Sequence, residues 1–336
     1  MPKLHGSSAL LLILSLIAGA AHAAALPASP PAEMQRLIGQ YGTPQSVLTV
    51  SEDRGRLYAD GRALAHALLT GRGVHYAAAL PGGERTAVDF DLHGGQAAAV
   101  SLMHERWPRH DFSAEVVAGI QAKVKADPAA VRAAALAATP PKEPTPKRAS
   151  DLVDLTTIDP GIKLDIGYAT PNNFMGFPLY ERAGAYLQRP AAEALGRAQK
   201  ALAAQGYGLL IHDAYRPWFV TKMFWDATPP EDHVFVADPA QGSRHNRGCA
   251  VDLTLYDLKT GKPVEMTGRY DEMSTRSYAD FPGGTSRQRA LRGILRAAME
   301  AEGFTVYPQE WWHFDYKDYA SYGIGTVTFT ELAQRR

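Results

Sequence analysis

The chain has 336 residues, 46% of them hydrophobic, and its 35 Lys and Arg residues balance its 35 Asp and Glu residues. This length predicts about two globular domains, and the composition suffices for ordinary packed cores. A formal net charge of zero gives no electrostatic reason for a polyanionic partner, so we expect neither nucleic acid nor an anionic membrane surface as a ligand.

Residues 1–23 have the order of a secretory signal peptide. Lys3 precedes an apolar run over residues 9–18, and Ala21 and Ala23 form a small-residue cleavage site. We therefore predict cleavage after Ala23 and a periplasmic location, with an uncleaved anchor as the alternative. No later segment has about 18 consecutive apolar residues, so no membrane span is expected in the mature protein.

Short alternating apolar runs follow this leader. SVLTVSEDRGRLYAD (46–60) and ERTAVDFDLHGGQAAAVSL (84–102) are broken by glycine and charged turns, which is typical of antiparallel strands. We predict a small β-rich accessory domain over residues 32–130. Its histidines lack metal-ligand spacing and are interpreted as surface residues, so the sequence does not indicate a role for this domain.

Residues 131–150 change from an alanine run to a segment rich in Pro, Lys and Thr. Prolines at 140, 141, 144 and 146 cannot sustain a helix and predict an extended linker. A protein that begins near Ser150 is then expected to fold and function alone, because the candidate site residues follow the linker. The alternative is that the β-rich domain covers the mouth of the site.

Helices and strands intermix over residues 151–332. Apolar residues recur at helical spacing in RPAAEALGRAQKALAAQGYG (189–208) and SRQRALRGILRAAMEAEGF (286–304), in which Gly206 and Gly303 are candidate C-terminal caps. Without a βαβ rhythm, this mixture predicts an α+β domain, with a central antiparallel sheet and flanking helices. The strand candidates are LDIGYAT (164–170), GLLIHDAY (208–215), CAVDLTLYD (249–257), FTVYP (304–308) and WHFDY (312–316).

The segment SRHNRGCAVDLTL (243–255) places a carboxylate within a predicted buried strand. Burial of an isolated charge is unfavourable, so Asp252 needs a partner, which a metal ion would supply. His245 lies in the loop before the strand, and Gly248 allows a tight turn between them. The alternative is that Asp252 pairs with an arginine and that His245 is an ordinary loop residue.

A second segment, PQEWWHFDY (308–316), has Glu310 and His313 three residues apart. A catalytic zinc site needs three protein ligands, an open position for water and a nearby carboxylate that is not a ligand. His245, Asp252 and His313 meet the first requirement, and Glu310 remains for the last. The alternative is an aromatic core strand with an incidental glutamate and histidine.

A third segment, HDAYRPWF (212–219), ends a predicted strand with Arg216. A guanidinium at the end of a strand can stabilise an oxyanion that develops during a reaction. The alternative role of Arg216 is an ion pair with Asp213 or another carboxylate.

Together, SRHNRGCAVD, EWWH and DAYRP resemble the motifs of the D-alanyl-D-alanine dipeptidases, which include the vancomycin-resistance enzymes, in the zinc D,D-peptidase superfamily (peptidase family M15). GYATPNNFMG (167–176) is similar to the N-terminal segment of that family, and YDEMSTRSY (270–278) is similar to its substrate-amine loop. The resemblance covers about residues 150–330, so the N-terminal part of the chain lies outside it.

The resemblance implies that His245, Asp252 and His313 bind one zinc ion per chain. It also implies that Glu310 is the general base and acid and that Arg216 stabilises the transition state. For such a base, we expect a pKa nearer neutrality than that of a free glutamate.

Asp271 and Ser243 match positions that this family uses near the free amino group of the substrate. The expected reaction is hydrolysis of the small dipeptide D-alanyl-D-alanine to D-alanine, in cell-wall turnover or recycling. The alternatives are a D,D-carboxypeptidase or peptidoglycan endopeptidase of the same superfamily, which YDEMSTRSY disfavours, and an inactive wall-binding protein, which the complete set of site residues disfavours. The sequence makes no prediction of the oligomeric state.

Cys249 is the one cysteine of the chain, so an internal disulfide is excluded. It stands between two predicted ligands, but strand alternation places it on the face opposite Asp252. We therefore interpret Cys249 as a packed thiol rather than as a metal ligand.

Overall fold

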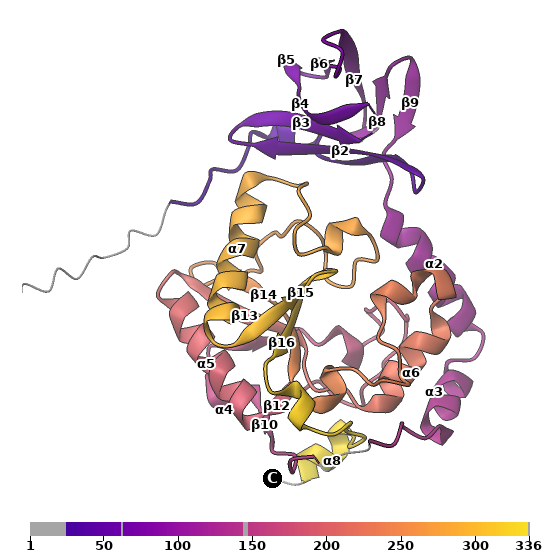
Figure 1. The fold of residues 1–336 in the computed structure, drawn as a ribbon, viewed down its shortest axis with the longest axis vertical. Coiled ribbons are helices and arrows are strands. Elements are labelled where there is room, and N and C mark those ends of the chain that lie inside the picture. The colour runs from indigo at the N-terminus through magenta and orange to yellow at the C-terminus, as the bar shows by residue number, and fades with distance from the viewer. Residues whose placement is uncertain (1–24, 62, 144–146, 335–336) are drawn as a thin grey trace, which may run out of the picture.

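The computed structural model describes residues 25–61, 63–143 and 147–334, and the predicted signal peptide, residues 1–23, lies outside them. Figure 1 shows an N-terminal part made of strands above a larger part that mixes helices and strands. This arrangement confirms the prediction of an α+β domain preceded by a β-rich region. Within the described ranges, no helix has the length and apolar character needed to cross a membrane.

The N-terminal part consists of two antiparallel sheets. Alternate side chains of both sheets form one buried core, in which Leu48, Val88 and Trp107 are packed. A short helix, α1 (Ala32–Gln35), precedes them. The first sheet contains β1 (Gly39–Thr43), β2 (Ser46–Asp53), β3 (Arg56–Gly61) and β4 (Leu64–Leu68), and the second contains β5 (Thr70–Arg72), β6 (His75–Ala79), β7 (Arg85–His93), β8 (Gln96–Leu102) and β9 (Glu105–Pro108).

Two helices follow β9. The sequence predicts β structure up to residue 130 and an extended linker over residues 131–150, so neither helix is expected. They are α2 (Phe112–Lys125) and α3 (Pro128–Ala137). Asp111 and Asp127 cap their N-termini, and Pro128 lies in the first turn of α3, where its missing N–H is tolerated. The alanine-rich residues 131–137 are helical, in agreement with the high helix propensity of alanine.

The helices α2 and α3 pack against the C-terminal domain. Ile120, Val124 and Ala135 share one buried cluster with Phe224 of α6 (Trp218–Ala227), and Figure 1 shows both helices alongside α6. Beyond α3, the carboxylate of Glu143 pairs with Arg247 at 2.6 Å and accepts a hydrogen bond from the Ile324 N–H at 2.9 Å. Residues 131–143 are thus anchored to the C-terminal domain instead of forming a free spacer.

A five-stranded sheet forms the centre of the C-terminal domain. Its order is β11 (Lys163–Leu164), β13 (Tyr207–Asp213), β14 (Ala250–Asp257), β16 (Glu310–Tyr316) and β15 (Phe304–Tyr307). β11 and β13 are parallel, and the other neighbours are antiparallel. The helices α5 (Arg189–Ala203) and α7 (Ser286–Ala301) contact the sheet and each other. The remaining elements are β10 (Leu152–Asp154), α4 (Leu155–Ile158), β12 (Tyr186–Gln188) and α8 (Phe329–Gln334).

The two amphipathic helices agree with the sequence pattern. The apolar face of α5 is buried, and Gly206 beyond it adopts φ 88°, a left-handed conformation that glycine permits without steric cost. The helix α7 begins with a capping box in which Thr285 and Gln288 satisfy each other's backbone N–H groups.

The predicted strand over residues 164–170 is wrong for most of its length. The strand β11 ends at Leu164, and residues 167–169 form a 3-10 turn. The carbonyl of Tyr168 accepts hydrogen bonds from the N–H groups of Leu179 and Tyr180, so this backbone is satisfied by a loop rather than by a neighbouring strand.

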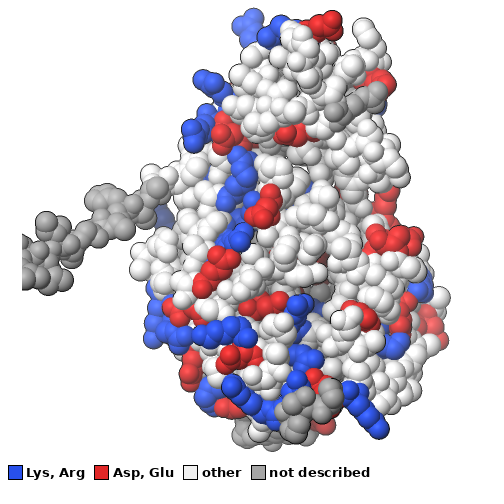
Figure 2. Space-filling view, viewed as in Figure 1, with Lys and Arg blue, Asp and Glu red and all other residues white. Residues whose placement is uncertain are grey.

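Charged side chains of both signs are interspersed over one face of the molecule. On the face drawn in Figure 2, Lys and Arg lie among Asp and Glu, and the described residues form no extended region of a single sign there. This face therefore offers no broad basic surface to a polyanion.

Candidate metal centre and active site

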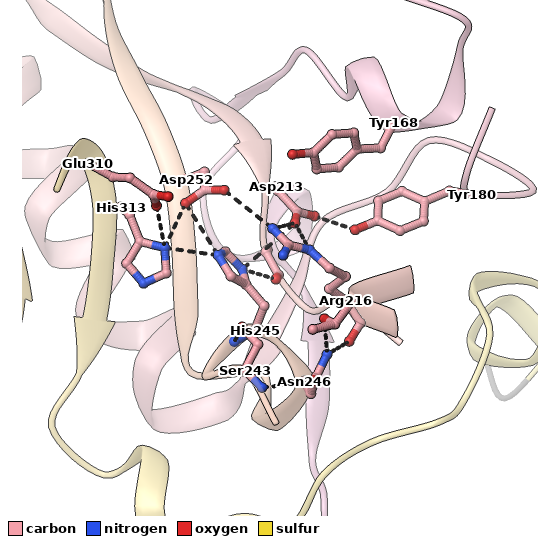
Figure 3. A network of polar contacts seen from close by, with 12 residues as sticks. Tyr168, Tyr180, Asp213, Arg216, Ser243, His245, Asn246, Asp252, Glu310 and His313 are labelled. Carbon is pink, nitrogen blue, oxygen red and sulfur yellow. Dashed lines mark hydrogen bonds and ion pairs between the residues drawn. The ribbon is translucent and has the colours of Figure 1, made fainter. Parts of the chain in front are cut away.

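The three predicted metal ligands lie together. Antiparallel pairing of β14 with β16 places Asp252 directly across from His313. His245 begins a 3-10 turn (His245–Arg247) that ends at Gly248, whose φ of 66° lets the chain turn sharply into β14. All three side chains are buried, and one ligand atom from each lies within 4.8 Å of the others (Figure 3).

Hydrogen bonds fix which ring nitrogen of each histidine faces this centre. His245 Nδ1 is 2.7 Å from the carbonyl oxygen of Ala214, and His313 Nε2 is 2.9 Å from a carboxylate oxygen of Asp315. Because these two oxygens only accept, each contact requires a proton on that nitrogen. When the two rings are neutral, as binding of a metal requires, His245 Nε2 and His313 Nδ1 carry the lone pairs, and these atoms lie 3.0 Å apart.

Asp252 completes a set of atoms that suits a cation. Its Oδ1 lies 3.3 Å from His245 Nε2 and 3.1 Å from His313 Nδ1, and within the described part of the chain this buried oxygen has no hydrogen-bond donor. Oδ2 accepts a hydrogen bond from the Tyr270 hydroxyl at 3.2 Å. Two imidazole nitrogens and a carboxylate oxygen converging at these distances fit a zinc ion.

Glu310 lies next to the three candidate ligands but does not belong to the metal-binding group. It begins β16, and its Oε2 lies 3.5 Å from His313 Nδ1. Burial raises the pKa of Glu310 to about 7; the nearby charge of His313 opposes this shift and that of Asp252 adds to it. A carboxyl group with such a pKa can accept and release a proton near neutral pH.

Arg216 lies at the same centre and is also paired. Its Nε and Nη2 are each 2.8 Å from Asp213 Oδ2, and Nη2 is 3.7 Å from Asp252 Oδ2. Asp213 accepts a further hydrogen bond from Tyr180 at 2.7 Å, and the guanidinium packs over the ring of Phe224. The ion pair with Asp213, the alternative role of Arg216, is therefore present, and it holds the guanidinium at the edge of the cavity (Figure 3).

Asp271 and Ser243 line the same cavity. Asp271 accepts a hydrogen bond from the Tyr168 hydroxyl at 3.0 Å, and its backbone adopts φ 55°. Burial raises the pKa of Asp271 well above its usual range, and the charge of Asp252 adds to the shift. The hydroxyl of Ser243 accepts a hydrogen bond from the His245 N–H at 3.1 Å.

The cavity is small and partly aromatic. Its volume is about 310 Å³, at the lower end of the range for small-molecule sites. Trp312, Tyr307 and Phe174 contribute rings to its wall, and residues 233–238 line it from a segment after α6. The described lining residues all lie between Tyr168 and His313, so the N-terminal part does not form this wall.

Sequence reasoning missed two residues that support the site, Tyr168 and Asp315, and it names Asp213 only as the partner in the alternative role of Arg216. Asp315 follows His313 by two positions, which places both on one strand face, and this spacing was a usable signal. Cys249 is a free, buried thiol in the hydrophobic core, as predicted, and the metal-binding group found among the described residues does not contain it.

An α+β domain with this site is a peptidase by comparison with known proteins. Residues 148–330 match the peptidase M15 family described as D-Ala-D-Ala dipeptidase, and the chain belongs to this family. This confirms the resemblance inferred from the motifs. The match begins after α3, so the N-terminal part lies outside it.

Three curated relatives show how far the similarity extends. The D-alanyl-D-alanine dipeptidase of Escherichia coli K12 is 38% identical over 175 residues, which are 52% of this chain and 89% of the relative. The D-alanyl-D-alanine dipeptidase of Enterococcus faecium is 37% identical over 176 residues, or 47% of this chain and 87% of the relative. That of Enterococcus faecalis V583 is 38% identical over 173 residues, or 46% of this chain and 85% of the relative.

Proposed function

We propose that this chain hydrolyses D-alanyl-D-alanine to D-alanine with one zinc ion held by His245, Asp252 and His313. The observation that carries the proposal is the buried Oδ1 of Asp252, which faces two imidazole lone pairs and has no donor among the described residues. Membership of the D-Ala-D-Ala dipeptidase family and the names of the three relatives support the choice of substrate.

Different residues of the chain have different roles in the proposed peptide hydrolysis. When bound, zinc would polarise the peptide carbonyl and acidify a coordinated water. Glu310, whose pKa is raised to about 7, takes a proton during the attack of water and delivers it to the leaving amine. Asp315 and the carbonyl of Ala214 keep the two histidines in the tautomers that direct lone pairs to the centre.

Arg216 supplies positive charge where an oxyanion would develop. Asp213 fixes the guanidinium through two contacts of 2.8 Å, so little reorganisation is needed during the reaction. The cost of burying the arginine is offset by its charged partner and by the Tyr180 hydrogen bond to Asp213.

Asp271 provides the selection for a free amino end. A carboxylate that is buried beside Tyr168 needs a cation to remain ionised, and the ammonium group of a dipeptide would supply it. An acylated or extended amino end lacks this charge and also needs more room in a cavity of about 310 Å³. We therefore favour a dipeptidase over a D,D-carboxypeptidase.

The proposed cellular setting rests on the leader. Residues 1–23 support export, and an exported enzyme would meet dipeptide released from the cell wall rather than the cytoplasmic pool. We propose periplasmic wall turnover or recycling as its role. N-terminal sequencing of the protein from a periplasmic fraction should find Ala24 as the first residue, and an intact Met1 would reject the export proposal.

The decisive experiment compares three substrates. Zinc-loaded protein is incubated with D-Ala-D-Ala, with N-acetyl-D-Ala-D-Ala and with a pentapeptide that ends in D-Ala-D-Ala, and released D-alanine is quantified. We expect release from the free dipeptide alone. Release from the pentapeptide would favour the carboxypeptidase alternative, and no release from any substrate would favour an inactive binding protein.

A further inference from the structure

The loop that carries Asp271 has a conformation that its neighbours must maintain. Asp271 has φ 55°, in the left-handed region that non-glycine residues seldom occupy. Such a backbone persists when surrounding contacts determine it. The position of the Asp271 carboxylate therefore depends on the contacts that hold residues 268–276.

Part of this support comes from within the loop. The carboxylate of Glu272 accepts hydrogen bonds from the Arg269 N–H at 2.7 Å and from the Ser274 hydroxyl at 3.1 Å, and it pairs with Arg276 at 2.7 Å. A side chain at Gly268 would meet the Arg276 carbonyl oxygen at 2.6 Å, so the two ends of the loop lie close together. These contacts close the loop but do not attach it to the rest of the molecule.

Two tyrosines attach this loop to the C-terminal domain. Tyr168 donates a hydrogen bond to the Asp271 carboxylate at 3.0 Å. Tyr270 donates one to Asp252 at 3.2 Å.

A further attachment comes from the first turn of α2. The buried hydroxyl of Ser113 accepts a hydrogen bond from the Met273 N–H at 2.9 Å, and Asp111 pairs with Arg269 at 2.7 Å. These contacts join both sides of Asp271 to a helix that lies outside the family match.

Other contacts of the N-terminal part continue along the same stretch. Gln40 donates a hydrogen bond to Thr275 at 3.2 Å, and the Glu52 N–H donates to the Gly284 carbonyl at 2.9 Å. The carboxylate of Glu52 accepts a hydrogen bond from the Ser286 N–H at 2.9 Å. The N-terminal part thus docks on residues 269–289, and that stretch contains the amine-binding candidate.

We propose that Ser113 and Asp111 are positioning residues, through which the first turn of α2, a helix that packs on the C-terminal domain, sets the place of Asp271 and so the affinity for the free amino group of the substrate. This inference rests on the proposed function, and it assigns a role to a region that the family match leaves out. Ser113 carries most of the effect, because its contact is buried and its loss leaves the Met273 N–H without an acceptor. Asp111 contributes less, because its ion pair is exposed.

The test uses the full-length zinc-loaded protein with single substitutions. Ser113→Ala should raise the KM for D-Ala-D-Ala about 10-fold and leave kcat within about twofold, since the ammonium contact is made equally in the ground state and in the transition state. Ser113→Thr keeps a hydroxyl and should restore a KM near that of the wild type. Asp111→Asn keeps a good helix cap and should raise KM about twofold. Asp127→Asn makes the same change at the cap of α3, away from the loop, and should alter neither constant.

A second readout does not depend on turnover. Hydrogen exchange of peptides that cover residues 268–276 should be about 10-fold faster in Ser113→Ala than in the wild type or Asp127→Asn. Equal falls in kcat and in zinc content would show general destabilisation and overturn the positioning role. Faster exchange with an unchanged KM would overturn the link to the substrate. A wild-type protein that releases no D-alanine would instead reject the proposed function, which is thereby distinguished from failure of this inference.

Discussion

Glu310 and His313 are three positions apart on one strand, and their roles separate at the scale of single residues. We expect His313→Ala to lose bound zinc, because one of three ligands is removed. We expect Glu310→Gln to keep zinc while turnover falls on the order of 100-fold or more, because the proton acceptor is lost. Metal analysis of dialysed protein and D-alanine release check both. Full zinc occupancy in His313→Ala would contradict the ligand assignment, and His245→Ala and Asp252→Ala serve as parallel tests.

Arg216 forms an ion pair with Asp213 in the structure and has a proposed role toward the oxyanion, and a lysine distinguishes the two. Arg216→Lys keeps a positive charge near Asp213 but cannot hold two fixed donors, so turnover should fall about 100-fold while fold and zinc content persist. Steady-state kinetics, circular dichroism and metal analysis provide the check. Arg106→Lys, at an exposed ion pair in the N-terminal part, is the control. Unchanged turnover would leave Arg216 with the ion pair alone.

Cys249 should be unreactive in the folded protein. Burial raises the pKa of its thiol to about 12, so hardly any thiolate exists at pH 8, and the sulfur is also inaccessible. A thiol reagent should modify it only after unfolding in guanidinium. Rapid stoichiometric modification of the native protein would contradict this.

The same thiol makes a small contribution to the pH dependence of stability. The unfolded thiol ionises at about pH 8.5, whereas the native thiol stays protonated until about pH 12. The unfolded state therefore binds fewer protons between these values, and this contribution to stability is present below about pH 8.5 and is lost as pH rises toward 12. Comparison of Cys249→Ala with the wild type over this range isolates the contribution. A stability difference that does not change with pH would contradict it.

At the scale of elements, Glu52 of β2 acts as a cap for α7 from outside the helix. Its buried carboxylate accepts hydrogen bonds from the backbone and hydroxyl of Ser286, where the helix has unsatisfied N–H groups. Glu52→Ala should lower the free energy of unfolding by about 1–3 kcal/mol, measured by chemical denaturation. Asp53→Ala, which removes a half-exposed ion pair with Arg289, should change it by less than about 1 kcal/mol. Equal effects would contradict the cap.

Some elements could be predicted from sequence alone because their apolar pattern lies within one short segment of the chain. The helix α5 shows a regular apolar face, and the buried strand β14 is a continuous apolar run apart from Asp252, Thr254 and its last residue, Asp257. The helix α2 was missed because few of its residues are buried and they include Ser113, which packs against another part of the chain. The ligand set was expected because the motifs resemble those of the dipeptidase family, whereas the left-handed Asp271 and its attachment to α2 depend on tertiary contacts that no local pattern encodes.

At the scale of the whole molecule, the packing of α2 and α3 disfavours the expectation that a protein beginning at Ser150 is independent. Removal of these helices exposes the apolar surface around Phe224 and leaves Arg247 without Glu143. We expect a protein that starts at Ser150 to be less soluble and to melt at a lower temperature than one that starts at Asp111, which keeps both helices. Equal melting temperatures and zinc contents for the two shortened proteins would restore the earlier expectation.

The docking of the N-terminal part on residues 269–289 also implies that binding of the substrate affects the docking. Linkage between two events is reciprocal: if docking improves the affinity for the substrate amine, then occupation of the amine site must strengthen docking by the same factor. The contacts of α2 with the loop, and those of the β-rich part with residues 275–289, would then be strongest when the cavity is occupied. A region outside the residues that match the family would in this way share the free energy of substrate binding, although none of its described residues lines the pocket.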